Sequence, residues 1–197
     1  MLEVSHLHVQ FKGYVVLSDV TMSFNENTLY LIHAQNGSGK STFLNAISGL
    51  IPYSGTITRN FHPKDFFYIP NNFEFDQNMS GYDYLKLYKN LWDSNTSIDD
   101  VITMLQIKNF IFNRIDSYSL GMKQMFTLAL YIISDTQIWL IDELNNGLDK
   151  KNNALLIQTL KSAKNKLIIF VTHQYQDISH VSDLVLTLED GKLVTNV

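Results

Sequence analysis

The chain has 197 residues, no cysteine, and a net charge of -4 at pH 7. Hydrophobic residues make up 45% of it, which is enough for a sizeable core and argues against disorder. This length fits one domain, or one core with an inserted sub-domain. The negative net charge offers no basic surface for nucleic acid, and the lack of cysteine excludes disulfides and thiolate metal sites.

No segment predicts a helix that crosses a membrane. The longest apolar runs, residues 128–133 and 167–171, are far shorter than the roughly 20 residues that span a bilayer. The N-terminal residues lack the charged-then-apolar layout of a signal peptide. We therefore expect a cytoplasmic protein that docks on a membrane if it works at one.

The first third of the chain predicts an antiparallel β lobe followed by a strand, a loop and a helix. Residues 4–11 and the alternating residues after the turn at Lys12-Gly13 are typical of paired strands. Residues 28–34 predict a buried strand that leads into a glycine-rich loop and a helix ending near Gly49. Two short strands are expected within residues 54–69.

The middle of the chain predicts helices. Residues 80–106 have a helical pattern with Ser97 and Asp100 as a capping pair, and residues 120–133 predict another helix. We interpret residues 1–197 as a single domain. A helical sub-domain is expected at about residues 72–125, inserted in the core.

Two further strands and a hairpin complete the predicted order. Residues 137–142 and 166–173 are continuous apolar runs separated by a helix from about residue 149 to residue 164. Such runs mark strands that are buried on both faces of a parallel sheet. A C-terminal hairpin with its turn at Asp190-Gly191 is expected to close the sheet.

The loop AQNGSGKST, residues 34–42, nearly satisfies the phosphate-binding pattern GxxxxGK[ST]. Gly37 and Gly39 let backbone N–H groups approach phosphate oxygens, and the helix N-terminus adds partial positive charge. Ala34 replaces the first glycine, and we expect the loop to tolerate it. A chance Gly-Ser turn containing a lysine is the alternative, against which the flanking strand and helix argue.

This loop predicts ATP and Mg²⁺ as cofactors. Lys40 would neutralise the β- and γ-phosphates, Ser41 is placed to ligate Mg²⁺, and Thr42 adds a hydroxyl toward the α-phosphate. The expected nucleotide contacts are Asn36, Gly37, Ser38, Gly39, Lys40, Ser41 and Thr42.

Two adjacent carboxylates, Asp142 and Glu143, follow a predicted strand at the carboxyl end, where ligands bind in open α/β sheets. Asp142 is the natural partner of Mg²⁺, and Glu143 can accept a proton from the attacking water or orient it. Acids that only cap a helix or turn are the alternative. His173 ends the next buried strand and is placed to contact the γ-phosphate or the water, although a single histidine there is more often structural. The candidate catalytic residues are therefore Glu143, His173 and Lys40.

Together these motifs resemble the ABC ATPase family. The deciding segment is YSLGMKQ, residues 118–124, which is similar to the family's LSGGQ signature in the variant form of many bacterial drug and antimicrobial-peptide exporters. The resemblance covers almost the whole chain. It implies an α/β P-loop NTPase fold with a mixed, largely parallel core sheet, an N-terminal antiparallel β lobe and a small α-helical signature sub-domain.

The resemblance also implies roles for residues outside the phosphate loop. Tyr14 falls where the family stacks an aromatic ring on adenine, and Asn71 stands where it usually has a Gln that contacts Mg²⁺ and the attacking water. Ser119 and Gly121 would form a second anion site that faces the γ-phosphate bound by another subunit. Asp149 ends NNGLD, which is similar to the family's D-loop, and His173 matches its switch histidine.

Besides Ala34 and Asn71, three further residues depart from the family pattern. Leu120 replaces the first glycine of the signature pair, Met122 stands where the signature ends in Gln, and Leu144 replaces the proline that usually follows the catalytic Glu. None of these changes removes a catalytic group. We therefore expect an active subunit, with two chains enclosing two ATP molecules.

As a member of this family, the chain is expected to be the motor subunit of an ABC transporter. It would lie on the inner face of the membrane and drive a separate permease, and an exporter of peptide or drug-like cargo is the expected branch. The second ATPase subunit would be another copy or a paralogue. Aromatic residues within 61–88 suit a permease-docking groove, although each could equally fill the core.

Two other function classes compete with this interpretation. A soluble ABC ATPase could act on a ribosome, on DNA or on a protein assembly without a permease. The length argues against the forms with two ATPase domains or long coiled coils. A small phosphate-loop kinase or GTPase would leave YSLGMKQ and His173 unexplained.

Overall fold

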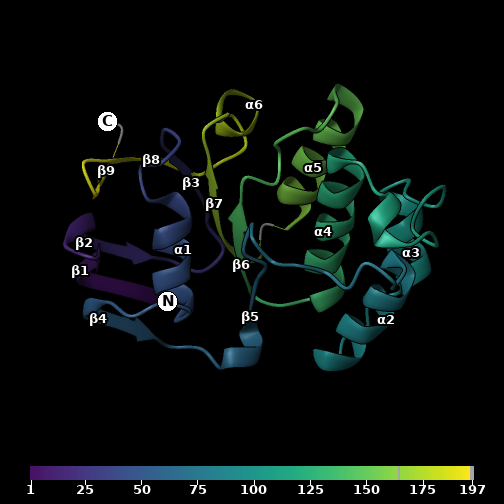
Figure 1. Ribbon diagram of the computed structural model, residues 1–197, viewed down its shortest axis with the longest axis horizontal. Coiled ribbons are helices and arrows are strands. Elements are labelled where there is room, and N and C mark those ends of the chain that lie inside the picture. The colour runs from purple at the N-terminus through teal and green to yellow at the C-terminus, as the bar shows by residue number, and fades with distance from the viewer. Residues whose placement is uncertain (164, 196–197) are drawn as a thin grey trace.

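One helix, residues 40–48, packs between two β-sheets and connects them through an apolar core. The computed structural model describes residues 1–163 and 165–195, and Figure 1 shows them running from a β lobe at one end to helices at the other. The strands are β1 (Leu2–Phe11), β2 (Tyr14–Phe24), β3 (Leu29–His33), β4 (Ser54–Arg59), β5 (Phe66–Tyr68), β6 (Ile138–Asp142), β7 (Leu167–Thr172), β8 (Leu184–Glu189) and β9 (Lys192–Thr195). The helices are α1 (Lys40–Ser48), α2 (Gly81–Leu91), α3 (Ile98–Met104), α4 (Leu120–Ser134), α5 (Lys150–Ser162) and α6 (Gln176–Ser179), with short 3-10 turns at Pro63–Asp65 and Ile115–Ser117.

The N-terminal lobe is an antiparallel sheet of order β2-β1-β4. Strands β1 and β2 pair from Leu2 opposite Phe24 to Phe11 opposite Tyr14. Lys12 and Gly13 both have positive φ, as a tight two-residue hairpin turn requires. The predicted lobe and its turn are therefore confirmed.

The second sheet has the order β5-β6-β7-β3-β8-β9, and every neighbouring pair is parallel except β8 with β9. All residues of β6 and β7 are buried, as their continuous apolar runs predicted. The hairpin at Asp190-Gly191 adds β9 to the edge, as expected. Helix α5 ends at Ser162, and residue 164, where we placed its end, lies outside the described residues.

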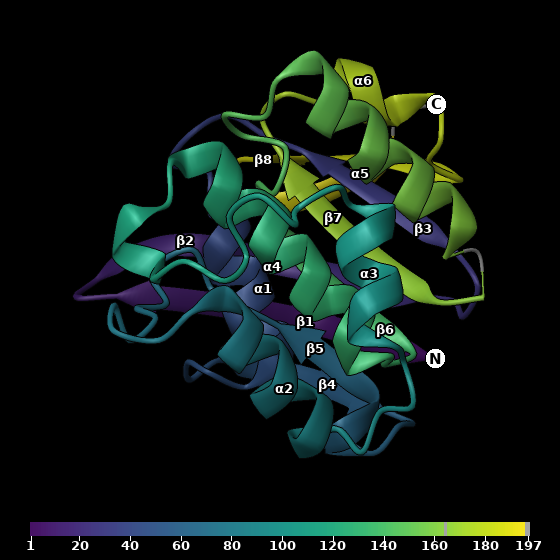
Figure 2. The ribbon, with the colours of Figure 1, turned by 90° about the vertical axis from the view of Figure 1, so that its right-hand side faces the viewer.

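Two apolar cores cover the two faces of this sheet. On one face, α1 inserts Phe43 and Leu44 between the sheet and the β lobe. On the other face, α4 and α5 pack against β6 and β7, and Figure 2 shows both helices in front of these strands. The same core continues into α2 and α3, so the middle helices are anchored to the sheet through α4.

The middle region contains two separate helices with serine caps. Ser80 Oγ accepts the N–H of Asp83 at 3.1 Å, and Ser97 Oγ accepts that of Asp100 at 3.3 Å. The predicted cap at Ser97 is thus confirmed. Within the described part of the chain, no helix combines the length and apolar character needed to cross a bilayer.

We expect Phe43→Ala to lower the free energy of unfolding by about 3–5 kcal/mol, because it removes a ring from between the two sheets and leaves a cavity. Urea unfolding followed by circular dichroism measures this loss. The matched control is Phe112→Ala, whose ring is 55% exposed whereas that of Phe43 is 0% exposed. Its expected loss is below about 1 kcal/mol, and equal losses would contradict the central place of Phe43.

Candidate functional site

The candidate site lies where the carboxyl ends of β6, β7 and β3 meet, with β7 between the other two. His33 pairs with Thr172, and Asp142 pairs with Val171, so the three strands end almost level. The loop after β3 carries Lys40, β6 delivers the two carboxylates, and β7 delivers His173. Residues far apart in the sequence thus converge on one edge of the sheet.

Two glycines shape the loop between β3 and α1, in which the N–H of Ser38 donates to Gln35 O at 3.3 Å. Gly37 and Gly39 have φ values of 80° and 102°, and Gly39 precedes α1 without a side-chain cap on the helix. A Cβ on Gly39 would lie 2.9 Å from Val16 Cγ1, so only glycine fits against β2. Ala34 is not among the residues with positive φ, which explains why alanine can replace glycine there.

Lys40 is buried against the loop and paired with a carboxylate. Its Nζ donates to Ala34 O at 3.1 Å and to Gln35 O at 2.9 Å. The same Nζ lies 3.1 Å from Glu143 Oε1. That carboxylate oxygen is also 3.1 Å from His173 Nδ1, so Glu143 links the phosphate loop to the end of β7.

Asp142 has a different environment from its neighbour. It is buried, and neither carboxylate oxygen has a hydrogen-bond partner within the described part of the chain. Burial is the largest influence and raises the pKa of Asp142. The nearby Ser41 hydroxyl lowers this pKa, the negative charge of Glu143 raises it, and the positive charge of Lys40 lowers it. Asp142 and the exposed Asn71 line a common cavity of about 280 Å³. This unsatisfied buried carboxylate is suited to a cation.

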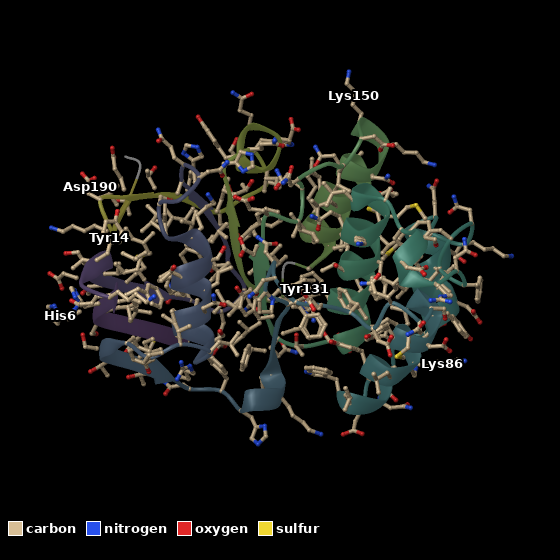
Figure 3. The ribbon with its side chains drawn as sticks, viewed as in Figure 1. His6, Tyr14, Lys86, Tyr131, Lys150 and Asp190 are labelled. Atoms are coloured by element: carbon tan, nitrogen blue, oxygen red, sulfur yellow. The ribbon has the colours of Figure 1, made fainter. Side chains whose placement is uncertain are left out.

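A cavity of about 760 Å³ lies between the phosphate loop and the C-terminal hairpin. Its lining consists of Tyr14, Val15, Val16, His33, Ala34, Gln35, Asn36, Gly37, Ser38, Thr187, Leu188, Glu189, Asp190 and Gly191. Tyr14 is 75% exposed, and Figure 3 shows it near Asp190 at the same end of the molecule. The exposed ring leaves a face free for a planar ligand.

The residues predicted to contact the ATP of another subunit lie together at the N-terminus of α4. Ser119 caps α4, and its Oγ accepts the N–H of Met122 at 3.3 Å. Ser119, Gly121 and Asp149 line a cavity of about 470 Å³, whose lining includes no residue of the phosphate loop. Leu120 lies against Gly147, where an added Cβ would come within 2.6 Å of Leu120 Cδ2. The predicted binding residues therefore fall into two groups on one chain.

Sequence reasoning missed two residues at this edge. His33 ends β3 as His173 follows β7, and its ring centroid is 4.2 Å from that of Tyr175. Burial lowers the pKa of His33, and so do the charges of Lys40 and His173. Asn145 contacts Thr172, the last residue of β7, and Gln174 beyond the strand, and it uses both of its side-chain polar atoms. Its position at the start of NNGLD was a signal, but only the final aspartate of that run was singled out.

We expect Asp142→Asn to stabilise the protein at pH 7 when nucleotide and Mg²⁺ are absent, because it removes a buried unpaired charge. The raised pKa means that the folded state binds more protons than the unfolded state above the ordinary value of 3.8, so wild-type stability falls as pH rises through the folded pKa. The advantage of the variant should therefore shrink toward acid pH. Urea unfolding in EDTA across this range measures it, and a less stable variant at pH 7 would contradict the prediction.

Comparisons with known proteins identify the family of this chain. The model of the ABC transporter family matches residues 17–146. The uncharacterized ABC transporter ATP-binding protein YybJ of Bacillus subtilis (strain 168) is 32% identical over 209 residues, covering 100% of this chain and 96% of that protein. The lantibiotic transport ATP-binding protein SrtF of Streptococcus pyogenes is 26% identical over 204 residues, covering 98% and 89%.

Solved structures share the fold. The ATP-binding subunit of an ABC transporter superposes with a TM-score of 0.88 at 22% identity, covering 99% of this chain and 90% of that one. An ATP-binding cassette in a dimeric post-hydrolysis state, bound to ADP and Pi, gives a TM-score of 0.84 at 18% identity, covering 99% and 98%. The expected α/β fold with its antiparallel lobe is confirmed. The chain belongs to the ABC transporter family and is its ATP-binding component, an ABC-type ATPase.

Proposed function

We propose that this chain pairs with a second ATPase subunit around two ATP–Mg²⁺ and drives a separate membrane permease. The observation that carries the proposal is the cluster of Lys40, Glu143 and His173 at the end of the phosphate loop. The Glu143 carboxylate there is within contact distance of both the Lys40 ammonium and the His173 imidazole. This set can hold a triphosphate and accept a proton from water.

Nucleotide binding would use the loop and the cavity beside it. The N–H groups of the first turn of α1, which no side chain caps, suit phosphate oxygens, and Ser38 Oγ is buried without a hydrogen-bond partner in the described residues. Lys40 would exchange its contact with Glu143 for the β- and γ-phosphates, and Thr42 would contact the α-phosphate. The exposed Tyr14 ring would stack on adenine.

The residues present fit a Mg²⁺ ion. The unpaired oxygens of Asp142 and the hydroxyl of Ser41 are the oxygen ligands that Mg²⁺ prefers, and Asn71 lies along the same cavity as Asp142. Among the described residues no cluster of three or more His, Asp or Glu side chains could hold a metal, so phosphate and water would supply the remaining ligands. Bound there, Mg²⁺ would neutralise charge on the phosphates.

Hydrolysis would be carried out by the chain's own polar groups. Water would attack the γ-phosphorus, the bond from the γ-phosphorus to the bridging oxygen would break, and ADP would leave. Glu143 would accept the proton of the water as its oxygen bonds to phosphorus, while His173 orients the carboxylate. Lys40 would stabilise the charge that develops on the phosphate oxygens.

The separation of the two groups of residues supports pairing. Ser119 and Gly121 sit at the N-terminus of α4, away from the phosphate loop of the same chain. A second subunit, either another copy or a paralogue, would bring this end of α4 and Asp149 to the ATP on its partner. The dimeric state of the solved ATP-binding cassette is consistent with this arrangement.

The helical sub-domain, at about residues 72–125, would receive the permease on the inner face of the membrane. Phe67 and Tyr84 are buried and fill the core, whereas Phe73 is exposed beside the cavity that Asn71 lines. An apolar segment of the permease would fit against Phe73. Because SrtF is named for lantibiotic transport, we infer export of a peptide as the cargo class.

We expect Lys40→Ala to abolish ATP binding and Glu143→Gln to retain binding while lowering turnover at least about 100-fold, because a neutral amide cannot accept the proton. Equilibrium binding of a fluorescent ATP analogue and phosphate release measure the two effects. Lys86→Ala is the control, because Lys86 lies at the opposite end of the molecule from Tyr14 in Figure 3. Near-normal hydrolysis by Glu143→Gln would overturn the role of Glu143.

We expect the tagged chain, purified from detergent-extracted native membranes with an ATP analogue, to bring down one polytopic membrane protein in comparable amount. Phe73→Asp should lose this partner yet keep ATP binding, because it places a charge on the docking surface. Phe11→Asp is the matched control on the distant β lobe, and the two rings are similarly exposed. Recovery with only ribosomal or assembly proteins would contradict the transporter role.

A further inference from the structure

A closed ring of hydrogen bonds surrounds the backbone at His173. Asn145 Oδ1 accepts from Thr172 Oγ1 at 2.9 Å, and Asn145 Nδ2 donates to Gln174 O at 2.8 Å. The ring is closed by Gln174 N, which donates to Thr172 Oγ1 at 3.0 Å. The residues on either side of His173 are therefore both tied to one amide side chain.

Two of the three residues of this ring are buried, and the third, Gln174, is exposed. Asn145 is 7% exposed and Thr172 is 1% exposed. A buried amide or hydroxyl without a partner is costly, so each bond of the ring holds the others in place. Buried polar networks with all members satisfied make the local structure rigid.

The ring extends the pairing of β6 with β7 beyond the end of the sheet. Glu143 N still donates to Val171 O at 2.9 Å, and Asn145 follows two residues later. Beyond this bond, the Asn145 side chain connects the segment after β6 to the end of β7 and the residues that follow it. Asn145 is thus close in sequence to Glu143, whose Oε1 is 3.1 Å from His173 Nδ1. The proposed hydrolysis depends most on the geometry of this contact.

The other side of the same segment is held by β3. Ala34 N donates to Thr172 O at 3.2 Å, and the ring centroid of His33, the last residue of β3, lies 4.2 Å from that of Tyr175. These contacts hold the segment against the phosphate loop. On the opposite side, which faces Glu143, the Asn145 side chain makes the hydrogen bonds to Thr172 and Gln174.

We propose that Asn145 is a positioning residue, which sets the distance between His173 and the carboxylate of Glu143 and thereby the rate of hydrolysis. The inference rests on the roles proposed above for Glu143 and His173. An aliphatic residue at this position would leave Thr172 Oγ1 and Gln174 O without the partner they now have. An aspartate would lose the donor to Gln174 O and add a carboxylate close to Asp142 and Glu143.

The test compares Asn145→Ala and Thr172→Val with Thr172→Ser in the full chain, measuring kcat, KM, ATP affinity and the free energy of unfolding. We expect both ring-breaking variants to lower kcat about 10-fold to 100-fold with ATP affinity nearly unchanged, since a small misplacement of catalytic groups is costly. Thr172→Ser keeps the hydroxyl and should restore kcat. The double variant should lose no more than the worse single variant, because both changes break one ring.

Asn153→Ala is the matched control. Its Nδ2 donates to Asp177 Oδ2 at 2.8 Å, so this variant also removes an asparagine contact to the region after β7, but outside the ring. Its kcat should equal that of the wild type. A loss as large as that of Asn145→Ala would overturn the proposal, because any asparagine contact would then suffice.

Different variants test the proposed function and the positioning role of Asn145. If Glu143→Gln hydrolyses ATP normally, the proposed function falls and the positioning role falls with it. If Glu143→Gln is inactive while folded Asn145→Ala or Thr172→Val turns over ATP like the wild type, the positioning role alone is wrong. Thr172→Val nearly keeps the volume of threonine and therefore still decides the question if Asn145→Ala does not fold.

Discussion

The contact between the buried Lys40 and the partly buried Glu143 spans the end of β7, because β7 lies between β3, which precedes the loop to Lys40, and β6, which precedes Glu143. Neither charge can be removed from such a place without leaving the other uncompensated, which is strongly unfavourable. The contact therefore requires the phosphate loop, β6 and the segment after β7 to keep their positions together. The two apolar cores, one on each face of the sheet, supply the rigidity that this requires.

Two adjacent carboxylates at this edge have opposite surroundings. Glu143 contacts an ammonium and an imidazole, whereas Asp142 is buried without a hydrogen-bond partner in the described residues, and its pKa is raised. Such a divergence between neighbouring acids is how a site separates two roles. The backbone contributes, because Glu143 has a φ of 50° and turns out of the strand.

The leucine at position 144, where the family usually has proline, permits the positive φ of Glu143. The residue before a proline is restricted to extended backbone, so the leucine at this position leaves Glu143 free to adopt a positive φ. Leu144 is buried, which anchors the turn in the core. A departure from the family pattern thus has a local structural consequence beside the proposed catalytic carboxylate, and the side-chain ring of Asn145 begins immediately after it.

Patterns in the amino-acid sequence were enough to predict the family, the phosphate loop and the alternation of buried strands with helices. These features depend on local causes: glycine where φ is positive, serine at a helix start, and apolar runs where both faces of a strand are covered. The three-dimensional arrangement was needed to learn that β7, which leads to His173, lies between β6 and β3, and that Asn145 forms hydrogen bonds to residues 27 and 29 positions away. The reason is that strand order and side-chain direction are set by contacts between distant segments, which a local pattern does not encode.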